Sequence, residues 1–140
     1  MSEQPIYEEL LSEDLPDTLA PWLACRAFTV PYPEPTDKPH PVGWYFADSE
    51  VGPVAFLIAY GETKVAPEVW WSTMAHELGH HHLHRDQLTR VPFGALPPNA
   101  KLSLQTEADQ WVVDRFGGEW WFEDLRPYTD EWARMEGVKP

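Results

Sequence analysis

The chain has 140 residues, of which 43% are hydrophobic and 14% aromatic, and its formal net charge at pH 7 is −13. This composition excludes a disordered chain and predicts a single domain over residues 1–140 with a modest hydrophobic core. The negative charge argues against direct binding to a nucleic acid backbone, which requires a basic surface. A basic protein partner, such as a DNA-binding protein, is compatible with that charge.

The sequence does not indicate a membrane or secreted protein. It has no apolar stretch of the length that spans a bilayer, and its acidic start is unlike a signal peptide. Cys25 is the single cysteine, so an internal disulfide is excluded. We therefore expect a cytoplasmic protein in which Cys25 is a small buried residue rather than a nucleophile.

The first 42 residues are predicted to form a helical and proline-rich segment. Residues 5–25 mix apolar and acidic side chains, and Pro16 and Pro21 divide them into short helical pieces. Five prolines follow within residues 31–41, which predicts an extended loop that folds over a cleft.

Residues 43–116 are predicted to form the core of the domain. Residues 43–47 and 54–60 are rich in aromatic and branched side chains, and a turn separates them. This pattern predicts a hairpin of two strands. By analogy with sheets that bind extended peptides, the strand at 54–60 would offer an edge to which a peptide adds as a further strand.

A long helix is predicted over residues 67–90. Pro67 suits the first helical position, and Pro92 prevents continuation beyond the predicted end. Apolar side chains recur at spacings of three and four and give the helix one apolar face: Trp71, Met74, Ala75 and Leu78. Gly79 costs this helix about 1 kcal/mol relative to alanine, so we expect a second helix to cross closely there.

The remainder predicts a proline-rich loop at 91–100, a helix at 101–116 and a tail over 117–140. Four apolar residues give the 101–116 helix an inward face: Leu104, Ala108, Trp111 and Val112. Gly117 and Gly118 are predicted to end it. The tail is predicted to hold a final helix near 129–135, and Trp120 and Trp121 are expected to pack in the core.

The strongest chemical signal is His-Glu-Leu-Gly-His at residues 76–80. Two histidines four residues apart on a helix project from one face, so His76 and His80 are predicted to bind one zinc ion. Glu77 between them is the predicted general base. His81 and His82 are expected to face solvent, and His84 to be a ligand or, in our preferred interpretation, a structural residue that supports one.

With Leu83-His84, the hairpin, and Glu107-Ala108-Asp109-Gln110-Trp111 on a later helix, this motif resembles the ImmA/IrrE family of metallopeptidases over about residues 43–116. The resemblance implies an α+β fold, a compact zincin-like domain in which a small antiparallel sheet or hairpin packs on helices and the motif lies on a central helix. It implies Zn²⁺ as cofactor and an intracellular peptidase whose substrate is a helix-turn-helix repressor, often of a phage or mobile element. It also implies that Asp109 orients a zinc-bound histidine.

The third ligand stays open between two residues. The family's pattern, aligned on Ala108 and Asp109, places the ligand at Gln105 where relatives carry a glutamate. Glu107 offers the better zinc ligand, a carboxylate, but two residues turn a helix by about 200°. Either Gln105 binds through its carbonyl oxygen, or Glu107 reaches the metal because the helix is shifted or unwound near Ser103, or the site binds metal poorly.

Two functions follow from these patterns. The first is a zinc-dependent metallo-endopeptidase that cleaves a protein substrate with water activated by Glu77. The alternative is a catalytically weak or inactive binding protein of the same fold, a regulatory or accessory factor of a phage or mobile element. The sequence gives neither the substrate nor the oligomeric state.

Overall fold

The computed structural model describes residues 8–32, 42–60, 67–135 and 137, and the other residues lie outside this description. The described chain forms four strands, β1 (Glu8–Leu10), β2 (Arg26–Tyr32), β3 (Val42–Phe46) and β4 (Val54–Tyr60), and three α-helices, α1 (Pro67–Arg90), α2 (Pro98–Phe116) and α3 (Arg126–Met135). Short 3₁₀ turns lie at Ser12–Asp14, Ala20–Trp22 and Phe93–Ala95. The α+β class is confirmed. None of the described helices combines the length and apolar character needed to cross a membrane.

The sheet is mixed, with the strand order β1-β2-β4-β3. The predicted hairpin is confirmed, because β3 pairs antiparallel with β4 and places Trp44 opposite Phe56. Of the expected antiparallel sheet or hairpin, only the hairpin is confirmed, because β2 pairs parallel to β4 over its whole length and makes the sheet mixed. β4 therefore lies inside the sheet, and the edge strand next to it is β3.

The first two strands were not expected from the sequence. β1 is short and begins with two glutamates, and β2 contains Pro31 within the segment for which the proline pattern predicts a loop. Of that predicted loop, residues 33–41 lie outside the described residues. Short helical turns at residues 12–14 and 20–22 agree with the predicted break at Pro16, whereas Pro21 lies inside the second turn and does not interrupt it.

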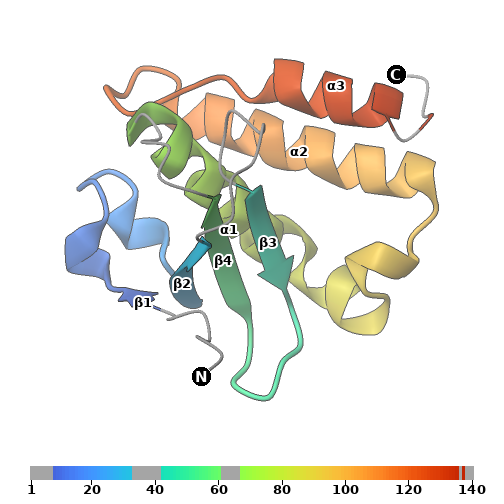
Figure 1. Ribbon diagram of the computed structural model, residues 1–140, viewed down its shortest axis with the longest axis horizontal. Coiled ribbons are helices and arrows are strands. Elements are labelled where there is room, and N and C mark those ends of the chain that lie inside the picture. Colours follow the sequence, from blue (N-terminus) through green and yellow to red (C-terminus); the bar gives the residue numbers. More distant parts are fainter. Residues whose placement is uncertain (1–7, 33–41, 61–66, 136, 138–140) are drawn as a thin grey trace.

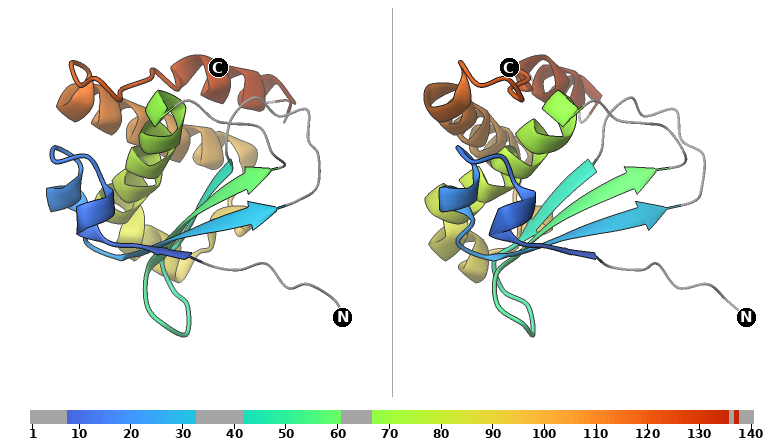
Figure 2. Two further views of the ribbon diagram at one scale, coloured as in Figure 1. Left: turned by 60° about the vertical axis from the view of Figure 1, so that its left-hand side comes forward. Right: turned by 90° about the vertical axis from the view of Figure 1, so that its left-hand side faces the viewer.

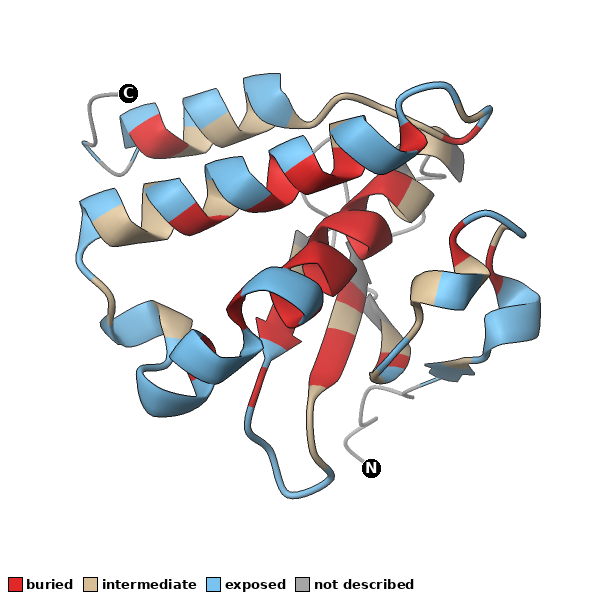
Figure 3. Cartoon of the chain, turned by 180° about the vertical axis from the view of Figure 1, so that it is seen from behind, coloured by how far each residue is buried: buried red, intermediate tan, exposed pale blue. Residues whose placement is uncertain are grey.

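The helices gather on one face of the sheet, as Figure 2 shows. β3 and β4 pack against α1, and three side chains of these strands are buried: Tyr45, Ala55 and Leu57. α2 packs on the opposite side of α1, and α3 runs beside α2 (Figure 1). α1 is therefore the central helix, and Figure 3 shows its middle almost entirely buried.

Residues 72–81 of α1 are all buried, since the sheet covers one side of the helix and α2 covers the other. The predicted apolar face is confirmed for Met74, Ala75 and Leu78, each with 0% of its surface exposed. The same stretch also buries histidines and a glutamate. Buried polar groups are costly unless they are hydrogen-bonded, so their partners define what this part of the molecule does.

Gly79 lies where α1 crosses α2. A Cβ atom at this position would lie 3.2 Å from Cε3 of Trp111 and 3.5 Å from the carbonyl oxygen of Ala108. The expected close neighbour is therefore confirmed. α2 begins at Pro98, three residues earlier than predicted, because proline is well accommodated in the first turn of a helix.

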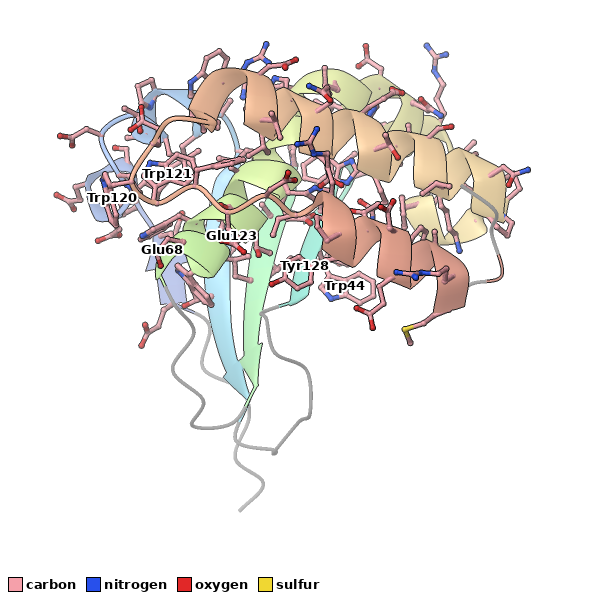
Figure 4. The ribbon with its side chains drawn as sticks, turned by 90° about the horizontal axis from the view of Figure 1, so that it is seen from above. Trp44, Glu68, Trp120, Trp121, Glu123 and Tyr128 are labelled. Atoms are coloured by element: carbon pink, nitrogen blue, oxygen red, sulfur yellow. The ribbon has the colours of Figure 1, made fainter. Side chains whose placement is uncertain are left out.

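The segment after α2 is tied to the beginning of α1. Ser72 Oγ donates to the carbonyl oxygen of Trp121 at 3.3 Å and accepts from the amide of Glu123 at 2.7 Å. Trp121 is fully buried and donates through Nε1 to Thr18 Oγ1 at 3.0 Å, whereas Trp120 is 66% exposed. Figure 4 shows this divergence of the two labelled tryptophans. The expected core role holds for Trp121 alone.

Candidate metal centre

His76, Glu77 and His80 come together on α1. Each offers a nitrogen or oxygen atom, and these atoms all lie within 4.8 Å of one another, which is metal-binding distance. The two imidazole rings are 4.8 Å apart between centroids, so the predicted common face is confirmed. All three residues are buried, with 4–7% of their surface exposed.

Gln105 of α2 faces both histidines. Its Oε1 lies 2.6 Å from Nε2 of His76 and 2.9 Å from Nε2 of His80. Glu107 lies elsewhere: its side chain is 54% exposed and its Oε2 is 3.4 Å from Nε2 of His84. α2 is regular from Pro98 to Phe116, without unwinding near Ser103. The structure thus brings the amide, not the carboxylate, to the histidine pair.

The other nitrogen of His76 meets Asp109, as the resemblance implies. Nδ1 of His76 lies 2.7 Å from Oδ1 of Asp109, which is 3% exposed. The second carboxylate oxygen accepts a hydrogen bond from Thr129 of α3. Burial disfavours the charged imidazole, but Asp109 and the charge of Glu77 outweigh it and raise the pKa of His76 to about 9.

The other nitrogen of His80 meets His84, one turn further along α1. The two Nδ1 atoms are 3.0 Å apart, and both residues are 4% exposed. Burial lowers the pKa of both histidines, and the charge of His76 lowers that of His80 further. Among the described contacts, His84 meets His80 and Glu107 but not Gln105.

These contacts determine where protons must lie, because amide and carboxylate oxygens accept hydrogen bonds but cannot donate them. Because Gln105 Oε1 can only accept, its two contacts require a proton on Nε2 of His76 and a proton on Nε2 of His80. The contact of His76 Nδ1 with the carboxylate of Asp109 requires a further proton on that Nδ1. His84 needs a proton on Nε2 to donate to the carboxylate of Glu107. The contact between Nδ1 of His80 and Nδ1 of His84 needs one shared proton. Without a cation, the three rings must carry two protons more than in their neutral forms to make every bond.

Comparisons with known proteins identify no relative. No family model, no curated protein and no solved structure matches this chain. What the site does is therefore argued from its own residues.

Gly43 of β3 makes room for Glu77. A Cβ atom at Gly43 would lie 2.8 Å from both Cγ and Oε1 of Glu77. Burial raises the pKa of Glu77 to about 7, which suits a group that exchanges protons near neutral pH. Our sequence interpretation missed Gly43, although a glycine inside an aromatic strand is a signal of close approach by another group.

We expect Gly43→Ala to destabilise the fold by about 1–3 kcal/mol, because the added methyl group overlaps a buried side chain that has little space to move. Denaturant unfolding of the purified variant measures this loss. Gly94→Ala is the matched control: a Cβ atom there has no neighbour within 4 Å, so its free energy of unfolding should stay within about 0.5 kcal/mol of the wild-type value. Equal stability of the two variants would contradict the close packing of Gly43 on Glu77.

The expected solvent exposure of His81 is wrong. His81 is 7% exposed, and its Nδ1 lies 2.7 Å from the hydroxyl of Tyr45. The reason is that the sheet covers the side of α1 that carries this histidine. His82 is exposed as expected, but its Nε2 also donates to the carbonyl oxygen of Trp22 at 2.8 Å.

Cys25 lies apart from the histidines. It is partly buried, and burial raises the pKa of its thiol to about 11, so little thiolate forms at neutral pH. It lines a surface hollow of about 640 Å³ formed by residues 9–13 and 23–26, which does not include the histidine cluster. These features agree with the expectation that Cys25 is not a nucleophile.

Proposed function

We propose that this chain is a zinc-dependent metallo-endopeptidase of the ImmA/IrrE type, acting on a protein substrate in the cytoplasm. The observation that carries the proposal is the convergence of three lone-pair donors, Nε2 of His76, Nε2 of His80 and Oε1 of Gln105, beside the carboxylate of Glu77. Three protein ligands with an adjacent carboxylate are the arrangement of a catalytic zinc site. A helix-turn-helix repressor is the substrate class that the sequence resemblance implies.

The proton requirement of the site supports a divalent cation. A cation held by His76, His80 and Gln105 would accept the lone pairs of the two Nε2 atoms in place of their two protons. Each of the three rings then carries a single proton, and every hydrogen bond to a carboxylate or between rings is kept. The charge of the cation equals that of the two extra protons, and the burial cost of charged imidazoles is avoided.

The ligand set explains how this site would differ from one with a carboxylate. Two imidazoles and an amide are all neutral, so a bound zinc ion keeps its full charge, whereas a glutamate ligand would offset part of it. We therefore expect weaker zinc affinity than a carboxylate would give. We also expect stronger polarisation of whatever oxygen occupies the open position.

In the proposed reaction, the zinc ion and the residues around it have separate roles. A bound zinc ion would supply a Lewis acid for the substrate carbonyl and would acidify a water molecule. Glu77 would take the proton of a water molecule as that water attacks the substrate carbonyl, and would deliver it to the amine released when the peptide bond breaks. Asp109 and Thr129 hold the ring of His76 in place.

The strand next to the site supports an extended peptide as substrate. β4 is an inner strand, so our expectation that it offers an edge is wrong, and β3 takes that place. Gly43 of β3 contacts Glu77, and Trp44 and Phe46 on the same strand are 49% and 46% exposed. A peptide paired with β3 would pass Glu77 and gain aromatic contacts.

The direct test of the proposal is the zinc content of the purified protein. We expect stoichiometric zinc in the wild-type chain and loss of zinc in His76→Ala and His80→Ala, because each variant removes one ligand. His82→Ala is the control, since it removes an exposed histidine of the same helix outside the cluster. Elemental analysis after dialysis against metal-free buffer gives the result.

The alternative is a binding protein of the same fold with little or no catalysis. The amide of Gln105 favours it, because an amide is a poorer zinc ligand than a carboxylate. The exposed aromatic side chains of Trp44 and Trp120 also fit a binding surface. A wild-type chain that takes up no zinc near neutral pH would favour this function over the peptidase.

A further inference from the structure

We infer that His84 and Glu107 are positioning residues for His80, which they hold with its Nε2 lone pair directed toward the metal position. The inference rests on the proposed zinc site and extends it from the ligands to the protein surface. Its geometric basis is an unbroken row of contacts: His80 Nδ1 to His84 Nδ1 at 3.0 Å, and His84 Nε2 to Glu107 Oε2 at 3.4 Å.

If both rings are neutral, only one placement of their protons satisfies every hydrogen bond in this row. The carboxylate of Glu107 can only accept, so Nε2 of His84 carries the proton and Nδ1 of His84 is bare. A bare Nδ1 accepts from Nδ1–H of His80. A neutral His80 with its proton on Nδ1 has a free lone pair on Nε2, the atom that faces Gln105. A carboxylate at the surface thus decides which nitrogen of a buried ring can bind metal.

His76 and His80 are then each held by a hydrogen bond that leads to a carboxylate, directly for His76 and through a second ring for His80. His76 donates directly to the buried carboxylate of Asp109, whereas His80 reaches a carboxylate through one intervening imidazole. Hydrogen bonds of this kind fix the tautomer and orientation of metal-binding imidazoles. α2 serves both roles toward His80, because Gln105 faces its Nε2 and Glu107 ends the row from its Nδ1.

Glu107 is the residue at which the inference is most safely tested. Its side chain is 54% exposed, so removing it leaves the core intact. We expect Glu107→Ala to weaken zinc affinity about tenfold, measured by competition with a chromophoric chelator. Asp114→Ala is the matched control, because it removes an exposed carboxylate of the same helix, with the same change in net charge, away from the row. Its zinc affinity should equal that of the wild type.

A double-mutant cycle distinguishes an effect of Glu107 that passes through His84 from a long-range effect of its charge on zinc affinity. In His84→Asn the amide oxygen takes the place of Nδ1 and still accepts from His80, but the link to Glu107 is gone. Adding Glu107→Ala to this variant should cause no further loss of zinc affinity. A second tenfold loss in the double variant would show that Glu107 acts through its charge alone and would overturn the inference. Thermal unfolding of the metal-free variants establishes that they are folded.

Nitrogen-15 NMR of the histidine rings gives a readout that a purely structural role would not move. In the zinc-loaded wild type we expect a protonated Nδ1 on His80, together with a protonated Nε2 and a bare Nδ1 on His84. In Glu107→Ala the tautomer of His84 should become mixed, because its acceptor is gone. A protonated Nδ1 on His84 in the wild type would refute the row.

The two proposals fail in different ways. A wild-type chain that binds no zinc defeats the zinc site itself. A wild-type chain that binds zinc, with Glu107→Ala binding it equally well, leaves the zinc site standing and defeats the positioning role.

Discussion

Glu77→Gln should lower the rate of peptide-bond hydrolysis by about 10²–10⁴-fold while the zinc content of the protein stays unchanged. The carboxylate lies within 4.8 Å of the ligand atoms of His76 and His80 but is not needed to complete the ligand set with Gln105. The amide of the variant has nearly the same shape and fits beside Gly43, yet it cannot accept a proton from water. Hydrolysis of an unstructured, fluorescence-quenched protein substrate measures the rate.

Glu68→Gln is the matched control for this result. It makes the same chemical change in the first turn of α1, away from the middle of the helix that carries Glu77; Figure 4 labels Glu68. Its hydrolysis rate should match that of the wild type. Wild-type hydrolysis by a zinc-loaded Glu77→Gln protein would rule out Glu77 as the general base.

Gln105→Glu should raise the zinc affinity at least about tenfold, which corresponds to about 1.4 kcal/mol of binding free energy. The replacement places a carboxylate at the position that faces Nε2 of both His76 and His80, and a charged oxygen is the stronger ligand. Gln105→Ala should lower the affinity by a similar factor, because no oxygen then faces the pair. Competition with a chromophoric chelator measures all three proteins on one scale.

Gln110→Glu controls for the added negative charge. It makes the same substitution on α2 at an exposed residue whose amide contacts Asp114 and not the histidine pair. Its zinc affinity should stay at the wild-type value. If Gln105→Glu and Gln105→Ala both bind zinc as the wild type does, Gln105 is not a ligand.

Much of the site was predictable because helices carry a strong periodic signal. The spacing of His76 and His80, the apolar face of α1 and the inward face of α2 all follow from residues three and four apart. The pattern of α2 also favours Gln105 over Glu107 by register alone. The chemical preference of zinc for a carboxylate ligand favoured Glu107 instead. In the structure α2 is a regular helix, so it is Gln105 that faces the histidine pair.

The sequence did not predict which element covers each side of helix α1. His81 was expected in solvent because a helix pattern shows which residues share a side but not what covers it. The cover over His81 includes Tyr45 of β3, which lies 36 residues away in the chain. A contact between residues so far apart leaves little local signal in the sequence. The same holds for β2, which pairs with the distant β4 and contains Pro31. The role of Gly43 depends on the same long-range packing, and so it also required the structure.

The hydrogen bond from Thr129 to Asp109 has a consequence for biosynthesis. His76 and His80 leave the ribosome first, and Gln105 follows about one helix later. Asp109 receives its bond from Thr129 only when α3 has been made and has docked on α2. A nascent chain that ends before α3 would hold the histidines without the group that fixes the carboxylate of Asp109. The orientation of Asp109, and through it that of His76, is thereby coupled to the synthesis and docking of α3.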